Sequence, residues 1–188
     1  MTSPYHRLQW SDGFTLKTHD APYHPSSGNV MLQFAPTSSQ SKTAHLGVGS
    51  LQASSCFRFD FRSARVGCDS NSSDCVFNIT GLRWDEAAQI EIPTKSEFFT
   101  VPACHDADGC ELGSILAGPS SALVDLTAID LDVQANSKST LWWADDIDFS
   151  WTDISCSAAV CRSIVRDTTD LRRRRALSGK IGANFGHR

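Results

Sequence analysis

The stretch Phe57-Arg58-Phe59-Asp60-Phe61 places phenylalanine at every second position, with a charged residue between neighbouring phenylalanines. Successive side chains of a β-strand point to opposite faces of its sheet, so this spacing predicts a strand with one face in the core and one in solvent. The same alternation recurs in Ile129–Val133 and in Ile147–Trp151. Because no window sustains an apolar stripe at the helical period of 3.6 residues, the pattern indicates an all-β protein.

Further segments have the composition of short strands, and turn-forming clusters of Gly, Pro, Ser and Asp separate them. They are Phe14–Lys17, Val30–Phe34, Cys75–Leu82, Ala88–Ile92 and Phe98–Val101. Many short strands divided by turns predict an antiparallel β-sandwich of the jelly-roll type. Because 188 residues fit a single core, we expect one such domain over residues 1–165, followed by a basic tail over residues 166–188.

The net charge of −4 is unevenly distributed along the chain. From Asp167 to Arg188 six Lys or Arg residues stand against two Asp, so this tail carries +4 and the rest of the chain −8. An acidic body argues against nucleic acid as a partner, since that affinity rests on neutralising phosphates. No apolar run approaches the roughly 20 residues that span a bilayer, so we expect no membrane span. The run Arg172–Arg175 predicts a disordered tail, or alternatively a cleavage site for proteases specific for paired basic residues.

Six of the seven cysteines form three close pairs around polar or small residues. The pairs are Cys68 with Cys75, Cys104 with Cys110, and Cys156 with Cys161. They predict three loop-closing disulfides, each stabilising the fold by about 2–2.5 kcal/mol in the chain-entropy model. Zinc is the alternative, although only Cys156 and Cys161 approach the usual ligand spacing and no pair of histidines stands nearby. The remaining Cys56 is predicted to be a buried free thiol on a strand.

Two acceptor sequons agree with an oxidising, secretory environment. They predict N-glycosylation at Asn71, within Asn71-Ser72-Ser73, and at Asn78, within Asn78-Ile79-Thr80. Together with the predicted disulfides they indicate an extracellular or cell-surface location. The chain begins without the apolar segment of a signal peptide, so we expect its start to be truncated.

Four short motifs stand out in the sequence: Tyr5–Trp10 with Gly13-Phe14, Phe57–Phe61 with Gly67-Cys68, Cys75–Gly81, and Asp145-Asp146-Ile147. Together they resemble the motifs of a secreted fungal domain family of unknown function, with the first similar to the opening of the family and the last to its close. The resemblance covers the chain from Tyr5 to Cys161. It implies a β-sandwich shaped like carbohydrate-binding modules, exported and often appended to surface proteins, and it implies no activity. The first strand that family members carry before the tyrosine is missing here, so we expect an N-terminal strand to be absent.

Tryptophan next to carboxylate suggests where a glycan would bind, because aromatic faces pack on sugar rings and a few polar groups bind the hydroxyls. Trp142 and Trp143 are followed by Ala144 and Asp145, and adjacent strand residues point to opposite faces. We therefore expect one of the two in the core and the other exposed. Trp84 and Asp85 form the second candidate, and core packing is the alternative for each tryptophan.

Calcium binds clusters of oxygen ligands, and Asp145, Asp146 and Asp148 form one such cluster, in which Asp145 and Asp146 are the candidate ligands. A structural calcium is therefore predicted there, and the loop His105–Gly109 offers a second candidate that is equally consistent with an ordinary turn. We expect no other cofactor.

Catalysis receives little support from the sequence. The six histidines have the setting of loop and surface residues, and no Gly-x-Ser-x-Gly motif accompanies them. A glycosidase needs two carboxylates across a cleft, for which Asp85, Glu86, Glu91 and Glu97 are the candidates. The leading hypothesis is a non-catalytic, secreted β-sandwich that binds glycan or another cell-surface component. The alternatives are a purely structural or adhesive domain of a larger surface protein and a divergent polysaccharide hydrolase or lyase.

Overall fold

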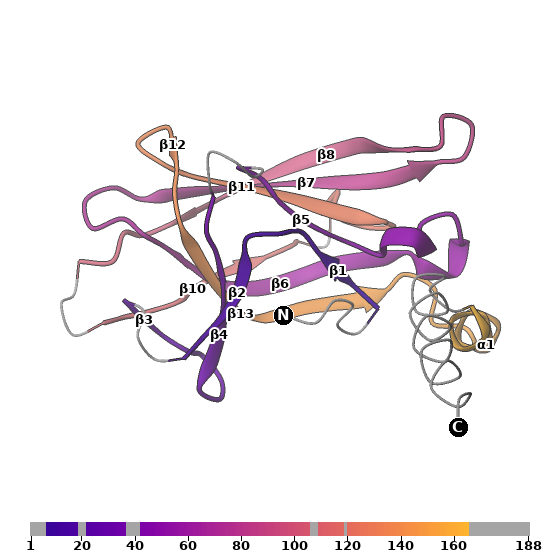
Figure 1. Cartoon of the computed structure of the whole chain (residues 1–188), viewed down its shortest axis with the longest axis horizontal. Helices are drawn as coiled ribbons and strands as arrows, with labels where there is room; N and C mark the ends of the chain where they lie inside the picture. Colours follow the sequence, from indigo (N-terminus) through magenta and orange to yellow (C-terminus); the bar gives the residue numbers. More distant parts are fainter. Residues whose placement is uncertain (1–6, 19–21, 37–41, 106–108, 119, 166–188) are drawn as a thin grey trace, which may run out of the picture.

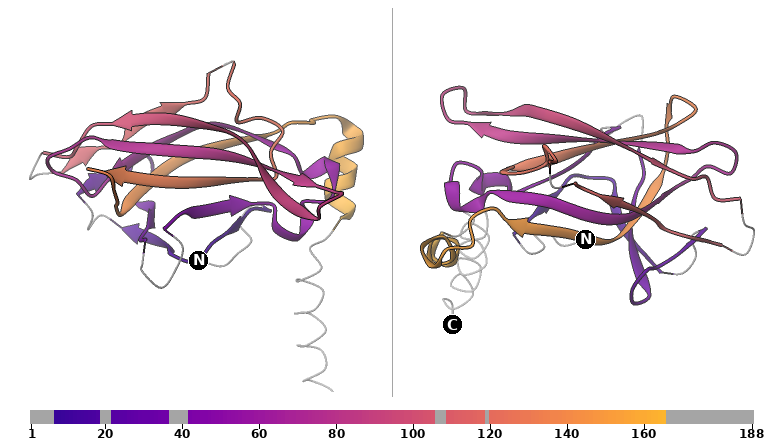
Figure 2. Two further views of the ribbon diagram at one scale, coloured as in Figure 1. Left: turned by 90° about the horizontal axis from the view of Figure 1, so that it is seen from above. Right: turned by 180° about the vertical axis from the view of Figure 1, so that it is seen from behind.

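The computed structural model describes residues 7–18, 22–36, 42–105, 109–118 and 120–165, and the predicted basic tail of residues 166–188 lies outside them. Two antiparallel sheets face each other in two layers (Figures 1 and 2). The predicted all-β, jelly-roll-like sandwich is therefore confirmed. Among the described residues, no helix is long and apolar enough to cross a membrane.

One layer, here called the β11 sheet, takes its strands from distant parts of the chain. Its order is β1 (Gln9–Trp10), β5 (Ala44–Gly47), β11 (Ala128–Ala135), β7 (Cys75–Asp85) and β8 (Ile90–Val101), and β12 (Lys138–Ser139) pairs with the end of β11. Ile129 lies between Leu46 on β5 and Gly81 on β7. Sequence-distant neighbours of this kind are typical of Greek-key connections.

The other layer, here called the β13 sheet, contains the tryptophan pair and the groove described below. Its order is β10 (Gly113–Leu116), β6 (Phe59–Cys68), β13 (Trp142–Trp151), β4 (Val30–Phe34) and β2 (Phe14–Thr18). A short parallel pair, β3 (Tyr23–His24) with β9 (Cys110–Glu111), lies apart from both layers.

The core fills the space between the two sheets, as the alternation in the sequence predicts. Phe59 and Phe61 on β6 and Ile129 and Val133 on β11 are at most 2% exposed. Aromatic contacts cross the layers, since the Phe77 ring on β7 lies 6.0 Å from that of Trp142 on β13. Burial of each of these side chains contributes about 1.5–3 kcal/mol, which is why the placement of apolar residues at every second position favours a two-sheet fold.

Most predicted strands appear, with changed boundaries. Two segments predicted as separate strands join in the single strand β8, which includes all of Phe98–Val101 but begins at Ile90, so that the first two residues of the predicted strand Ala88–Ile92 lie in the turn of residues 86–89. The structure also contains an α-helix that the sequence pattern does not predict, α1 (Cys156–Ile164), at the end of the sandwich beyond β13 (Figure 1). The Ser155 hydroxyl caps its first turn by accepting a hydrogen bond from the Ala158 N–H.

Three disulfides are present, and one of them differs from the prediction. Cys68–Cys75 and Cys104–Cys110 form as expected. The predicted pair Cys156–Cys161 is wrong, because both residues lie on α1 and five helical positions separate their Cα atoms by about 8.6 Å, beyond the roughly 7 Å that a disulfide spans. Cys161 instead bonds to Cys56, across a sequence separation of 105, and Cys156 is the exposed free thiol.

A buried carboxylate fixes two loops to β6. Asp60 is 7% exposed, and its Oδ1 accepts hydrogen bonds from the Asp125 N–H at 2.9 Å and the Thr152 hydroxyl at 2.6 Å. Its Oδ2 accepts a hydrogen bond from Arg62 Nη2 at 3.0 Å. The alternation in Phe57–Phe61 predicts that Asp60 points to solvent. In the structure it is buried instead and holds the segments before β11 and after β13 in place.

Candidate functional site

The tryptophan pair at the start of β13 is buried on both sides. Trp142 faces the core at 2% exposure, with its ring 5.7 Å from that of Phe34. Trp143 points to the outer face of the β13 sheet and is 4% exposed, because Tyr23 on β3 covers it with a ring distance of 5.4 Å. The prediction that one of the two is exposed is wrong.

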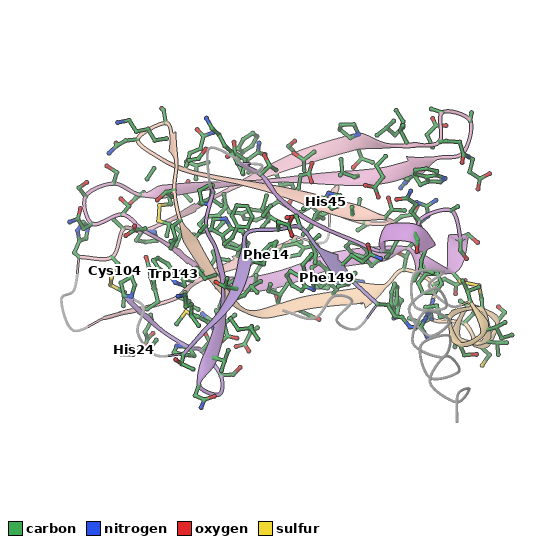
Figure 3. The ribbon with its side chains drawn as sticks, in the orientation of Figure 1. Phe14, His24, His45, Cys104, Trp143 and Phe149 are labelled. Carbon is green, nitrogen blue, oxygen red and sulfur yellow. A yellow bond between two sulfur atoms is a disulfide. The ribbon has the colours of Figure 1, made fainter. Side chains whose placement is uncertain are left out.

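The cover over Trp143 depends on a glycine. Gly67 on β6 lies opposite Trp143, and a Cβ atom at this position would come within 2.5 Å of the Tyr23 ring. The Tyr23 hydroxyl donates to the Cys68 carbonyl at 3.1 Å and accepts from the Cys68 N–H at 3.2 Å. Figure 3 shows Trp143 beside Cys104, at the end of the molecule opposite α1. Trp143 thus belongs to a small second core.

The second predicted glycan site, Trp84 with Asp85, lies near the end of β7. Trp84 is half-buried, and the Asp85 carboxylate accepts hydrogen bonds from the backbone N–H groups of Ala87 and Ala88 at 2.8 and 2.9 Å. The carboxylate therefore holds the β7–β8 turn. Neither residue lies with Trp142 and Trp143, nor in the groove described next.

A groove opens where β4 and β13 separate. The two strands pair from Trp142 with Phe34 to Ala144 with Leu32, and no described strand pairs with this edge of β13 beyond Ala144. On the other edge, β13 continues along β6 as far as Trp151 with Phe59. The wedge between the start of β4 and this half of β13 has a volume of about 810 Å³, within the range of small-molecule sites.

The wall and floor of the groove are mainly aromatic and aliphatic. From β13 it is lined by the half-buried side chains of Ile147, Phe149 and Trp151, and Trp10 on β1 lines it from the opposite sheet. Leu16 on β2 forms part of the rim at 55% exposure. Figure 3 shows Phe149 on the half of β13 that lies toward α1.

Three carboxylates stand along the same stretch of β13. The register with β6 shifts between Asp145 and Asp148, and Asp146 adopts a φ of 48°, so the strand bulges here. Ser27 holds the bulge, since its N–H donates to Asp145 Oδ2 at 3.0 Å and its hydroxyl to Asp146 Oδ1 at 2.6 Å. The exposed Asp148 adds a third carboxylate to the lining.

These contacts bear on the predicted calcium site at Asp145 and Asp146. The two carboxylates serve as acceptors for Ser27, and the described part of the chain contains no group of three or more His, Cys, Asp or Glu side chains arranged to hold a metal. Calcium binding there stays a prediction. The second candidate loop includes Asp106 and Asp108, which lie outside the described residues.

The two predicted glycosylation sites differ in their exposure. Asn71 is exposed in the loop closed by the Cys68–Cys75 disulfide, and its carbonyl is 2.7 Å from His105 Nδ1. Asn78 is half-buried on β7, opposite the 68%-exposed Phe98 of β8.

A polar cluster occupies the outer face of the β11 sheet. His45 on β5 lies with its Nδ1 2.8 Å from Asp130 on β11 and its Nε2 3.7 Å from Glu91 on β8. The hydrogen bond to Asp130 raises the pKa of His45, and burial opposes this shift in part. His45 therefore links three strands, a role beyond that of the loop histidine that the sequence predicted.

Sequence reasoning missed the groove residues Trp10 and Trp151 as site residues. The alternation of Ile147, Phe149 and Trp151 places them on one face, which the pattern alone assigns to the core. What exposes them is the end of pairing between β4 and β13, a long-range feature that has no local signal.

Together these features define a disulfide-linked antiparallel β-sandwich with a groove along an open strand edge. The chain belongs to the DUF7371 family, a domain of unknown function whose family profile matches residues 1–162. This confirms membership of a domain family of unknown function. The crystal structure of a DUF4465 family protein from Bacteroides caccae is similar, with a TM-score of 0.48, 11% identity, and coverage of 77% of this chain and 79% of that chain. No curated protein matches the chain.

Proposed function

We propose that this domain is a non-catalytic module that binds a neutral glycan chain in the groove along β13. The observation that supports the proposal most directly is the groove itself, which Trp10, Phe149 and Trp151 line together with the carboxylates of β13. Aromatic side chains offer faces for sugar C–H groups, and carboxylates accept hydrogen bonds from hydroxyls. The proposal moves the site from Trp142 and Trp143, which are buried, to the other half of the same strand.

The charge of the groove narrows the ligand class. Its described lining contains Asp145, Asp146 and Asp148 and no Lys or Arg. Uncompensated carboxylates repel sulfated or uronic-acid polymers, so a neutral or cationic chain fits better. The open edge from Asp145 to Trp151 extends about 20 Å at roughly 3.3 Å per residue, which favours an extended chain over a single sugar.

The same lining gives no specific support to a hydrolase or lyase. Glycosidases place two carboxyl groups on opposite sides of the scissile bond. The carboxylates among the described lining residues all come from β13, so they stand on one wall. A purely structural or adhesive domain, the remaining alternative, predicts that the groove binds no glycan.

A secreted setting completes the proposal. Three disulfides are compatible with an extracellular protein. We extend the proposal to glycosylation at the exposed Asn71 and at Asn78 during export. Intact-mass measurement of the exported protein before and after enzymatic removal of N-glycans tests this part.

The glycan proposal is tested by binding of the full chain to laminarin, chitohexaose, yeast mannan and xylan. We expect at least one of these probes to bind, and Trp151→Leu to weaken that binding roughly thirtyfold, as the loss of about 2 kcal/mol at an aromatic anchor requires. Asp148→Ala, which changes an exposed carboxylate, should weaken it as well. Phe98→Ala is the matched control, because it removes an exposed aromatic ring outside the groove.

Two results would overturn the proposal. In one, the folded wild-type chain binds none of the four probes. In the other, Phe98→Ala abolishes binding while Trp151→Leu and Asp148→Ala retain it. Melting temperatures of all variants show whether a loss of binding reflects a loss of folding.

A further inference from the structure

The free edge of β13 has the chemistry of a strand-addition site. Between Asp145 and Trp151 it pairs with β6 on one edge, and no described strand pairs with the other. Its inward side chains Ile147, Phe149 and Trp151 are half-buried at a position where a further strand would cover them. An unpaired row of N–H and C=O groups beside apolar pockets is the arrangement that extended peptides bind by adding a strand.

The C-terminal sequence of this chain has the pattern that such an edge requires. Apolar or small residues occupy every second position from residue 177 to 185, and the positions between them are mostly polar. The large apolar residues are Leu177, Ile181 and Phe185, at every fourth position; in an extended strand they share one face with Gly179 and Ala183, while Ser178, Lys180 and Asn184 lie on the other. A strand with this pattern presents one apolar face and one polar face.

The charges of the groove and of the C-terminal segment also favour binding of that segment at the open edge of β13. The run Arg172–Arg175 directly precedes the alternating segment, and it carries four positive charges. The groove offers Asp145, Asp146 and Asp148 at one end of the open edge, with no cation among its described lining residues. Opposite charges at these two places guide the segment toward the groove and fix its register.

The point where the described chain ends makes the contact reachable. Val165 follows α1, and its carbonyl accepts a hydrogen bond from Arg7 Nη1 at 3.0 Å, next to Leu8 in the groove lining. Arg162 of α1 lies 5.1 Å from the Trp151 ring. The seven residues from Val165 to Arg172 span up to about 23 Å when extended, which matches the roughly 20 Å from the Trp151 end of the edge to the aspartates.

We propose that residues 176–185 bind along the open edge of β13 as an added strand, running parallel to it, with Leu177, Ile181 and Phe185 in the groove. The Arg172–Arg175 run then lies against the aspartates of the bulge. This segment competes with any other ligand of the groove. The competition with a glycan rests on the function proposed above, whereas the docking of the segment does not.

Hydrogen–deuterium exchange of the full chain, without glycan, tests the docking. We expect the amides of residues 176–185 and of 147–151 to exchange at least roughly tenfold more slowly in the wild type than in Ile181→Asp. Asn184→Asp is the matched control, because it adds the same charge on the polar face of the segment. This control should keep the wild-type protection.

Three outcomes overturn the docking. In the first, residues 176–185 of the wild type exchange at the rate of an unfolded peptide. In the second, Ile181→Asp and Asn184→Asp show the same exchange. In the third, dilution removes the protection and also dissociates a dimer seen by sedimentation analysis, which would assign the added strand to a second copy of the chain.

The competition has its own readout. If the segment occupies the groove nine-tenths of the time, Ile181→Asp should bind laminarin, or whichever of the four probes binds, roughly tenfold more tightly than the wild type. An unchanged affinity contradicts the competition. If neither chain binds any probe, the glycan function fails, while the exchange result decides the docking by itself.

Discussion

Removal of the Cys56–Cys161 disulfide should destabilise the domain more than removal of either short-loop disulfide. The bond joins residues 105 apart in sequence, and the chain-entropy model assigns about 4.7 kcal/mol to a loop of roughly 100 residues. Cys104–Cys110 has a separation of 6, for which the same model gives about 2.3 kcal/mol. We therefore expect Cys56→Ser/Cys161→Ser to lose roughly twice as much unfolding free energy as Cys104→Ser/Cys110→Ser.

Cys156→Ser is the discriminating control. Cys156 is an exposed free thiol on α1, so its replacement should change the free energy of unfolding by less than about 0.5 kcal/mol. The paired variant is needed for Cys56 and Cys161, because a single substitution leaves an unpaired thiol at the other position.

Guanidinium unfolding of oxidised protein, followed by tryptophan fluorescence, measures all three variants. Peptide mapping without reduction identifies the bonds directly. The reasoning is refuted if Cys156→Ser costs several kcal/mol while the Cys56→Ser/Cys161→Ser variant is near neutral, or if mapping finds Cys156 bonded to Cys161.

Two further perturbations test the polar contacts of the fold. Asp60→Ala should destabilise the domain by about 2–3 kcal/mol, because it removes the charged acceptor of the Asp125 N–H and of the Thr152 hydroxyl; a loss below about 0.5 kcal/mol in urea unfolding would contradict this role. The pKa of His45 is raised in the folded protein. Its ion pair with Asp130 therefore stabilises the fold fully when the pH is below the pKa of about 6.5 that histidine has in the unfolded chain, and this stabilisation is lost as the pH rises through the pKa of the folded state. The melting temperature of the wild type minus that of His45→Gln should therefore decrease as the pH is raised from 5.5 to 8.5. A difference that does not change with pH would refute this contribution.

The sequence allowed the fold class to be predicted because period two acts locally. Phe57–Phe61 needed no knowledge of partners to indicate a half-buried strand, although the structure starts that strand at Phe59 and makes residues 55–57 a 3₁₀ turn. The helix α1 was missed, because nine residues give little periodicity and α1 buries only Ala158. The wrong cysteine pair follows from that omission, since the spacing suits a loop and not a helix.

The sequence-predicted tryptophan pair and the groove lie at opposite ends of the same strand, β13. Alternation correctly separates Trp142 from Trp143 onto opposite faces, yet it cannot indicate that Tyr23 covers the outer face. The same strand's Phe149 and Trp151 read as core from their spacing, while the divergence of β4 leaves them beside a groove. Both differences arise from contacts between segments more than 100 residues apart, for which local periodicity carries no signal.

The five tryptophans provide the most direct test of the groove as the ligand site. Full-length protein labelled with 5-fluorotryptophan gives one fluorine resonance per tryptophan, and single Trp→Phe variants assign them. On titration with the binding polysaccharide, the resonances of Trp10 and Trp151 should shift, whereas those of Trp84 and of the buried Trp142 and Trp143 should remain in place. A shift confined to Trp84, or to Trp142 and Trp143, with Trp10 and Trp151 unchanged, would contradict the assignment of the site to the groove along β13.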